Sequence, residues 1–270
     1  MKEYLRLFRL GNGAIGILGV LIGAFIATGV GIADHLLGIA VGCVVVAVSI
    51  AGGNSLNDYI DRDIDRIGHP DRPLPKGEIT PAAALRVGIV LLAAAVAISL
   101  ILQSVQVTGA VIVAVVLMAA YETLLKQRGF VGNIVIALLT GMVFLFGGAI
   151  VGDVMSVAVM AAMAALVNVG REIAKDIEDM GSDEGRKTLP MTLGARNAAI
   201  VGAAFFVSGP ALSVWPLLDH TFGPLYCLVF AADAIFIYTA FIIFRNAHKA
   251  QKLAKIAMPI AMAAFVLGVV

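Results

Sequence analysis

Residues 54–76 read N-S-L-N-D-Y-I-D-R-D-I-D-R-I-G-H-P-D-R-P-L-P-K and place five aspartates at the border of an otherwise apolar chain. On a helix, at about 100° per residue, one face of this stretch carries Asn54, Asn57, Asp58, Asp61 and Asp65. Asp63 points to the opposite side. Carboxylates stacked one turn apart repel each other, so this face needs a counter-charge. Mg²⁺ is the expected counter-ion, because it binds oxygen ligands and keeps positions open for substrate phosphates.

The composition predicts an integral membrane protein. Of the 270 residues, 60% are hydrophobic and 14% are charged, whereas soluble domains carry about 25% charged residues. The net charge of +1 gives no indication of a nucleic-acid partner, and we expect none. The expected fold class is therefore an all-α polytopic membrane protein, surrounded by membrane lipid.

Apolar segments of spanning length recur along the whole chain, which predicts a single membrane-embedded domain over residues 1–270. Residues 1–10 alternate basic and apolar side chains and suit an interfacial helix. Residues 59–80 and 178–191 are expected to be cytoplasmic active-site loops. We expect nine spans, at about 12–33, 36–58, 81–103, 106–125, 131–152, 155–177, 192–214, 222–244 and 251–269.

The distribution of basic residues predicts the orientation. All nineteen Lys and Arg residues fall in the N-terminal segment and in every second connection between the expected spans, while the other connections carry none. Short loops rich in Lys and Arg stay in the cytoplasm. We therefore expect a multi-pass protein of the cell membrane with its N-terminus in the cytoplasm and its C-terminus outside. The acidic stretch then lies near the cytoplasmic face.

A second acidic stretch, residues 168–190, reads N-V-G-R-E-I-A-K-D-I-E-D-M-G-S-D-E-G-R-K-T-L-P. If its helix continues past Gly181, one face carries Asn168, Glu172, Asp176, Asp179 and Asp183. Both stretches end in a basic-Leu-Pro element, R-P-L-P at 72–75 and K-T-L-P at 187–190. We therefore expect two pseudo-repeats whose acidic faces meet on one side of the membrane and hold Mg²⁺ together with a polyphosphate.

Two other interpretations compete with a metal and diphosphate site. Charge runs at membrane borders are usually solvated loops, but two runs with the same face and the same exit favour a site. A secondary transporter also uses half-repeats and intramembrane acids. Transporters place those acids near the bilayer midplane, and here Asp233 alone lies in the middle of a span. For Asp233 we expect a hydrogen-bonded, neutral packing role.

Three motifs resemble those of the UbiA superfamily of intramembrane prenyltransferases. The family's N-D-x-x-D-x-x-x-D signature is matched in full from Asn57 to Asp65, and its D-x-x-x-D element is matched by Asp179 and Asp183. A looser third element, Tyr then Lys then Gly-Asn, is matched by Tyr121, Lys126, Gly132 and Asn133. Nine spans are also the family's architecture, so the resemblance covers the whole chain. Within the family, the motifs are most similar to the archaeal ether-lipid branch.

The resemblance implies an Mg²⁺-dependent transfer of a geranylgeranyl group from geranylgeranyl diphosphate to the hydroxyl of geranylgeranylglyceryl phosphate. An aromatic or quinone-precursor acceptor is the alternative within the family. The expected metal ligands are Asn57, Asp58, Asp61, Asp65, Asp176, Asp179 and Asp183. The expected catalytic residues are Asp61, Asp65, Asp179, Asp183, Lys126 and Tyr121. The expected substrate-binding residues are Asn54, Arg72, Lys76, Lys126, Arg9, Asn12, Arg171, Glu172 and Lys175.

The chemistry of the transfer gives these groups distinct tasks. Basic side chains at Arg72, Lys76 and Lys126 suit the phosphates of the leaving diphosphate. Aromatic faces shield an allylic cation, and Tyr59 and Tyr121 are the nearest in sequence. A phosphate on the acceptor needs further cationic or amide partners, either Arg9 with Asn12 or Arg171 with Lys175. The sequence leaves the oligomeric state open.

Overall fold

A computed structural model describes residues 2–126, 128–180 and 187–270, and the regular secondary structure in these ranges is helical. The α-helices are α1 (Lys2–Phe8), α2 (Leu10–Thr28), α3 (Leu36–Ile60), α4 (Arg62–Gly68), α5 (Pro81–Ser99), α6 (Val105–Ala120), α7 (Phe130–Val151), α8 (Met155–Asp179), α9 (Leu189–Leu193), α10 (Ala195–Ser213), α11 (Trp215–Leu218), α12 (Val229–Ile242) and α13 (Ala247–Val269). Shorter turns are η1 (Gly29–His35), η2 (Leu100–Leu102), the π-helical η3 (Tyr121–Leu125) and η4 (Pro224–Leu228).

Local sequence signals explain where several of these helices begin. Thr80 precedes α5, its hydroxyl accepts a hydrogen bond from the backbone N–H of Ala83 at 3.3 Å, and Pro81 fills the first helical position. Ser104 caps α6 in the same way, through the N–H of Val107 at 3.3 Å. Such caps satisfy backbone donors that the first turn of a helix leaves without a partner. The two helices therefore start where a cap residue meets an apolar run.

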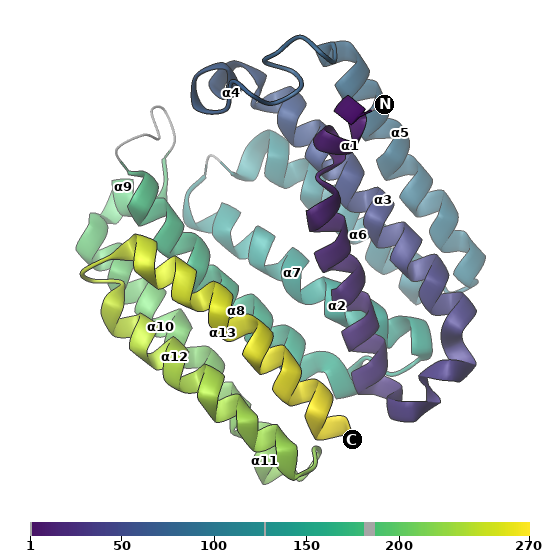
Figure 1. The fold of residues 1–270 in the computed structure, drawn as a ribbon, viewed down its shortest axis with the longest axis vertical. Helices are drawn as coiled ribbons and strands as arrows, with labels where there is room; N and C mark the ends of the chain where they lie inside the picture. The colour runs from purple at the N-terminus through teal and green to yellow at the C-terminus, as the bar shows by residue number, and fades with distance from the viewer. Residues whose placement is uncertain (1, 127, 181–186) are drawn as a thin grey trace.

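The membrane-spanning character of the chain is confirmed. Within the described ranges, eight helical stretches are long and apolar enough to cross a membrane. The first, Leu10–Ile60, has 51 residues and would measure about 76 Å if straight, against about 30 Å of hydrocarbon. It contains α2 and α3, and the chain reverses at η1 between them (Figure 1). The expected count of nine therefore differs from the eight stretches because two expected spans lie in one continuous helical run.

Small residues allow the central helices to approach closely. A Cβ atom placed on Gly23 of α2 would lie 2.2 Å from the carbonyl oxygen of Phe144 in α7. A Cβ on Gly147 of α7 would lie 2.3 Å from the carbonyl oxygen of Val20. Only glycine fits at these contacts, and such close backbone packing is the usual basis of helix association in lipid. The α2–α7 contact fixes one wall of the interior that the site uses.

The two ends of the bundle differ in what they carry. Figure 1 shows α1 and α4 at one end and α11 with the C-terminus at the other. The first acidic stretch lies at the α4 end, because α3 runs into α4 there. The expected continuous helix is wrong in one detail: α3 ends at Ile60, and Asp61, with φ −84° and ψ 3°, joins it to α4.

The two segments expected to be loops are partly helical. Within 59–80, residues 62–68 form α4, because hydrogen bonds from each backbone N–H to the carbonyl four residues earlier resume after Asp61. Within 178–191, the first two residues belong to α8 and the last three to α9. The expected metal ligand Asp183 lies outside the described residues, as does Gly181, so the continuation of that acidic face stays a prediction.

Candidate active site

Three aspartates of the first stretch are buried at the junction of α3 and α4. Asp58, Asp61 and Asp65 expose only 2%, 8% and 3% of their surface. The side chain of Asp63, two residues from Asp61 and from Asp65, is 68% exposed and pairs with Arg62 and Arg66 on the surface. The predicted face is thus confirmed by burial. Buried carboxylates require charged or hydrogen-bonding partners.

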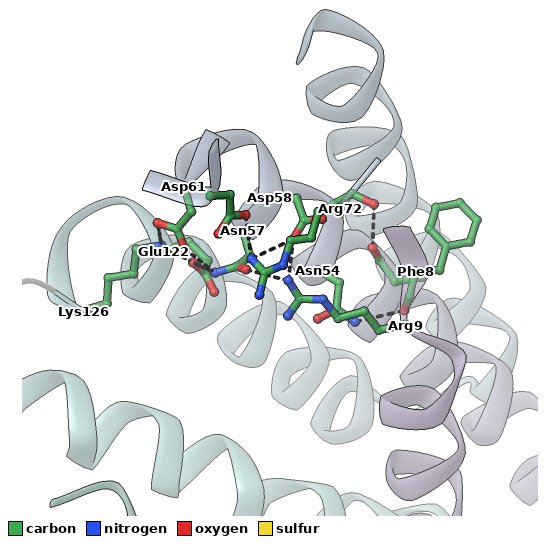
Figure 2. Close-up of polar contacts among 12 residues, drawn as sticks. Phe8, Arg9, Asn54, Asn57, Asp58, Asp61, Arg72, Glu122 and Lys126 are labelled. Carbon is green, nitrogen blue, oxygen red and sulfur yellow. Dashed lines mark hydrogen bonds and ion pairs between the residues drawn. The ribbon is translucent and has the colours of Figure 1, made fainter. Parts of the chain in front are cut away.

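Two arginines supply part of this compensation (Figure 2). A guanidinium nitrogen of Arg9 donates to a carboxylate oxygen of Asp58 and, at 3.2 Å, to the amide oxygen of Asn57. Arg72 lies 2.5 Å from Asp65 and 3.8 Å from Asp58. Arg9 is in the left-handed backbone region, with φ 50°, at the break between α1 and α2. Because that conformation is unfavourable for a non-glycine residue, its side-chain contacts help to hold the break.

The amide of Asn54 fixes the same break from the α3 side. Its nitrogen donates to the backbone carbonyl of Phe8 at 2.9 Å (Figure 2). This bond ties the last turn of α1 to α3, directly beside Arg9. Asn54 therefore positions the segment that carries Arg9, and it also lines the cavity described below.

A lysine from the end of α6 pairs with the third aspartate. The π-helical turn η3 brings Glu122 and Lys126 toward α3, where the Lys126 ammonium lies 2.6 Å from Asp61 and 2.9 Å from Glu122. The amide nitrogen of Asn57 donates to the same two carboxylates, at 3.1 Å and 2.8 Å. Figure 2 shows these four side chains pointing toward one another. π-Helical turns are frequent at functional sites.

The second acidic stretch is organised by hydrogen bonds between α7 and α8. The amide nitrogen of Asn133, in the first turn of α7, donates to Asp176 at 2.8 Å. One helical turn further from the end of α8, Arg171 contacts Glu172 at 2.5 Å and the amide oxygen of Asn168 at 3.3 Å. Asp176, Glu172 and Asn168 therefore share the polar side of α8, as the sequence predicts.

Residues 121–133 connect the two acidic stretches. Lys126 binds Asp61 of the first, and Asn133, seven positions later, binds Asp176 of the second. The turn between them is tight, because a Cβ on Gly132 would lie 2.7 Å from the carbonyl oxygen of Leu125. Gly129 has φ 56°, and a Cβ there would lie 2.6 Å from the carbonyl oxygen of Lys187. Both glycines of this turn are thus required by close backbone contact.

An apolar cavity of about 390 Å³ lies between α2, α3, α6 and α7 and adjoins this polar cluster. Its walls include Val45, Val111, Phe144 and Phe146, and its polar lining comes chiefly from helix ends near the acidic cluster. Those polar residues are Asn12, Asn54, Tyr121 and Glu122. A cavity with apolar walls and a few polar groups at one end is typical of a site for a ligand with a long apolar part.

Some expected site residues lie elsewhere. Lys76 is exposed and pairs with Asp71 at 3.0 Å, rather than with the buried aspartates. Tyr59 packs with Leu7 and Leu74 in a separate apolar cluster, so its ring does not line the cavity. Lys175 is exposed on α8. Tyr59 and Lys175 point away from the cluster because a helix turns neighbouring positions by about 100°.

Two residues of the site were missed or left undecided by sequence reasoning. Glu122 is buried within the first cluster, and its spacing of four from Lys126 is the signal that indicates such a pair. Asn133 was recognised only as part of a motif, whereas the structure gives it a contact with Asp176. No local pattern indicates that contact, because it joins residues 43 positions apart.

The cluster fits Mg²⁺ by its chemistry rather than as a preformed cage. Among the described residues, no three His, Cys, Asp or Glu side chains are grouped so that they could hold a metal ion. The buried aspartates instead face Arg9, Arg72 and Lys126. Their donor set consists of carboxylate and amide oxygens, which Mg²⁺ prefers. These basic side chains neutralise the aspartates, which is the same task that a bound cation would perform.

Known proteins are similar to this chain over nearly its whole length. A digeranylgeranylglyceryl phosphate synthase of Thermococcus kodakarensis is 39% identical over 260 residues, which cover 94% of this chain and 92% of the relative. A solved structure concerned with digeranylgeranylglyceryl phosphate synthase in membranes superposes with a TM-score of 0.88 at 32% identity, covering 99% of this chain and 98% of that chain.

A more distant solved structure shares the fold. The UbiA homologue from Archaeoglobus fulgidus bound to GPP and Mg²⁺ has a TM-score of 0.69 at 16% identity, covering 98% of this chain and 99% of that chain. The model of the UbiA prenyltransferase family matches residues 16–265 of this chain. The acidic cluster, the turn that joins both acidic stretches and the apolar cavity therefore belong to a member of the UbiA prenyltransferase family.

Proposed function

We propose that this chain transfers a geranylgeranyl group from geranylgeranyl diphosphate to the hydroxyl of geranylgeranylglyceryl phosphate. The observation that carries the proposal is a buried cluster of acidic and basic side chains beside an apolar cavity of about 390 Å³. A prenyl diphosphate has the same two parts, a highly charged head and an apolar tail. Family membership supports prenyl transfer over the transport activity considered from the sequence.

The head of the substrate is assigned to the two acidic stretches. We assign the metal to the oxygen ligands Asn57, Asp58, Asp61, Asp65, Asp176, Asp179 and Asp183. Bound Mg²⁺ would supply the positive charge that stabilises a leaving diphosphate. The solved homologue bound to GPP and Mg²⁺ supports the choice of metal through the shared fold.

The basic side chains of the cluster have a second task in this proposal. Arg72 and Lys126 lie against the aspartates and are partly or largely buried. Arginine forks and the lysine ammonium bind phosphate oxygens with charge-assisted hydrogen bonds, so these groups also suit the diphosphate. The exposed pair of Lys76 with Asp71 gives Lys76 no such contact, and we leave it out of the clamp.

The tail is assigned to the cavity between α2, α3, α6 and α7. Ile15 lines the cavity and is also 70% exposed on α2, which supports an opening toward lipid. Tyr121 stands where the polar lining meets the apolar walls. An aromatic face there would stabilise positive charge at the first carbon of the prenyl group, and excluding water would protect that carbon from hydrolysis.

The relatives decide our choice of acceptor. Relatives named digeranylgeranylglyceryl phosphate synthase match over nearly the full length of both chains. A lipid phosphate requires an additional anion-binding group. We assign this task to Arg9 with Asn12, since Asn12 lines the cavity and Arg9 lies at the adjacent helix break. Arg171, beside the second stretch, is the other candidate.

We further propose nine spans in one domain, with the N-terminus and the site at the cytoplasmic face. The N- and C-terminal ends lie at opposite ends of the bundle (Figure 1), and an odd number of crossings requires that arrangement. Counting α2 and α3 separately raises the eight candidate stretches to nine. The connections rich in Lys and Arg support the orientation.

An acceptor panel tests the proposal. Purified protein in lipid nanodiscs is given labelled geranylgeranyl diphosphate and Mg²⁺ with geranylgeranylglyceryl phosphate, 4-hydroxybenzoate or no acceptor. We expect labelled diether lipid only with the glycerol phosphate acceptor, and loss of product when EDTA removes the metal. Product with 4-hydroxybenzoate alone would contradict the acceptor, and product of equal yield in EDTA would contradict the metal.

A further inference from the structure

Glu122 is a buried carboxylate at the boundary between the acidic cluster and the apolar cavity. Its side chain is 10% exposed, and the residue also lines the cavity. One of its oxygens accepts hydrogen bonds from the amide of Asn57 at 2.8 Å and from the ammonium of Lys126 at 2.9 Å. These two donors also hold Asp61. Glu122 and Asp61 therefore share one set of partners.

The sharing leaves the group with an excess of negative charge. Lys126 places a single ammonium between two carboxylates, 2.6 Å from Asp61 and 2.9 Å from Glu122. Its side chain is only 8% exposed, so water contributes little to its stabilisation. The formal charge of the three side chains is thus −1. If Asp61 binds another cation, Lys126 still has Glu122 as its partner.

The π-helical turn explains why both contacts come from one segment. The backbone N–H of Lys126 donates to the carbonyl of Tyr121, five residues earlier, at 3.0 Å. A turn of this kind is wider than an α-helical turn. It keeps Glu122 and Lys126 in contact with each other while both side chains reach α3.

Building on the proposed transfer reaction, we propose that Glu122 is a positioning residue that acts through Lys126. It anchors the ammonium beside Asp61, so that Lys126 neutralises this carboxylate before metal binds. When Asp61 turns to the metal, Lys126 keeps Glu122 as its partner and remains at the site, where it contacts the diphosphate.

Removing either side chain should therefore change metal binding in opposite directions. Without Glu122, Lys126 has Asp61 as its one remaining carboxylate contact of those described, and it competes more strongly with the metal. Without Lys126, nothing at this position competes for Asp61. The negative charge of Glu122 also attracts the metal ion directly through space. Its removal therefore lowers the metal affinity by an amount that is the same with and without Lys126.

A double-mutant cycle in metal binding separates these effects. The variants are Glu122→Gln, Lys126→Met and the combination of both, in nanodiscs without prenyl substrate. The readout is the half-saturating concentration of Mn²⁺, which binds the same oxygen ligands as Mg²⁺ and is followed by its EPR signal. We expect Glu122→Gln to raise this concentration about tenfold when Lys126 is present and less than threefold when it is absent. Lys126→Met alone should lower it.

Glu78→Gln is the matched control, because Glu78 pairs with Arg6 outside the cluster. It should leave the half-saturating concentration unchanged. Thermal unfolding of every variant, without metal, reports whether the fold persists. If Glu122→Gln does not fold, Glu122→Asp in the same cycle serves instead, since it keeps the charge but shortens the reach to Lys126.

The outcomes separate the inference from the proposed function. An equal loss of Mn²⁺ binding in both backgrounds would make Glu122 a metal ligand and overturn the positioning role. An unchanged Mn²⁺ affinity in Glu122→Gln would overturn it as well. A protein that follows the cycle but gives no transfer product would keep this inference and refute the proposed acceptor chemistry. A native protein that binds no Mn²⁺ without prenyl substrate would overturn this inference alone, because the acceptor panel tests the transfer reaction with the diphosphate present.

Discussion

Among the residues that the structure describes, buried carboxylates occur at two places, and their surroundings differ. At the α3–α4 junction, Asp58, Asp61 and Asp65 each face a basic side chain. Asp233 in α12 is 5% exposed, and its hydrogen-bond partner is the hydroxyl of Ser213, at 2.6 Å. Within the described part of the chain its second oxygen has no hydrogen-bond partner.

Burial without a cation favours the neutral form of Asp233. The hydroxyl group of Ser213 is the donor in two contacts, 2.7 Å to the carbonyl oxygen of Pro210 and 2.6 Å to a carboxyl oxygen of Asp233. Tyr226 completes the group by donating to the backbone carbonyl of Ser213 at 2.9 Å. A neutral acid without a cation suits a structural role in an apolar interior.

The α3–α4 junction and Asp233 show what distinguishes an acidic site from an acidic core residue in this fold. A carboxylate that is paired with a basic side chain can exchange this partner for another cation. A carboxyl group that is neutral and held by a hydroxyl cannot do so. Burial alone does not separate the two cases, because Asp61 and Asp233 are buried to a similar extent.

The largest expected effect tests the charged side of this comparison. Asp61→Asn keeps the size of the side chain but removes a charge that pairs with Lys126. We expect transfer activity to fall about 10²-fold or more, because the leaving diphosphate loses electrostatic stabilisation. The measurement is the initial rate of labelled lipid formation at saturating Mg²⁺.

Asp63→Asn is the control for that experiment. Asp63 lies on the exposed side of α4 and pairs with Arg62 and Arg66, so activity should stay within about twofold of the native rate. Equal losses in the two variants would mean that the net charge of this region, rather than the buried face, supports the reaction.

The next effect concerns the turn that joins the two acidic stretches. Gly132→Ala places a Cβ 2.7 Å from the carbonyl oxygen of Leu125, and backbone must move to relieve the contact. We expect an activity loss of about tenfold and a stability loss of about 1–3 kcal/mol, as for other overpacked sites. Steady-state kinetics and thermal unfolding measure the two quantities.

Gly109→Ala provides the matched control, since a Cβ at Gly109 in α6 meets no atom within 4 Å. Alanine is also the better helix former, so stability should stay the same or rise slightly. If Gly132→Ala behaved like Gly109→Ala, the tight turn would not be needed to hold Lys126 and Asn133 in place.

The sequence predicts much of this site because its signals are local. Asp58, Asp61 and Asp65 follow helical spacing, and the exposed position of Asp63 follows from the same periodicity. Arg72 of the basic-Leu-Pro element lies only seven residues from Asp65, and the structure pairs the two side chains, whereas the sequence analysis assigned Arg72 to the diphosphate. The membrane class follows from composition alone.

What the sequence does not predict depends on contacts between distant segments or on backbone breaks. The bond from Asn133 to Asp176 joins α7 to α8, and no spacing rule relates the two positions. Tyr59 was expected near the reacting carbon, but its side chain packs against Leu7 and Leu74. The left-handed backbone at Arg9 is likewise set by tertiary contacts with α3 rather than by propensity.

A smaller effect is expected on the neutral side of the comparison. Asp233→Asn keeps the shape of the side chain, and its amide oxygen can accept the hydrogen bond from Ser213 as the carboxyl oxygen does. Activity should stay within about twofold of the native rate, and stability within about 1 kcal/mol. Unfolding in detergent and the transfer assay give the two numbers. A strong loss of activity in this variant would mean that Asp233 takes part in function. It would contradict the difference between the paired aspartates of the α3–α4 junction and Asp233.

The smallest effect is expected at Lys76, which sequence reasoning placed among the phosphate-binding groups. Its ammonium lies 3.0 Å from Asp71, and both side chains are largely exposed. This hydrogen bond lowers the pKa of Asp71, so the pair is already satisfied without the buried cluster. Lys76→Met should therefore leave the KM for geranylgeranyl diphosphate within about twofold, whereas Arg72→Met should raise it clearly, because Arg72 contacts Asp65 directly. If the two variants raised the KM equally, Lys76 would have to reach the diphosphate during binding, and the segment after α4 would have to close over the site.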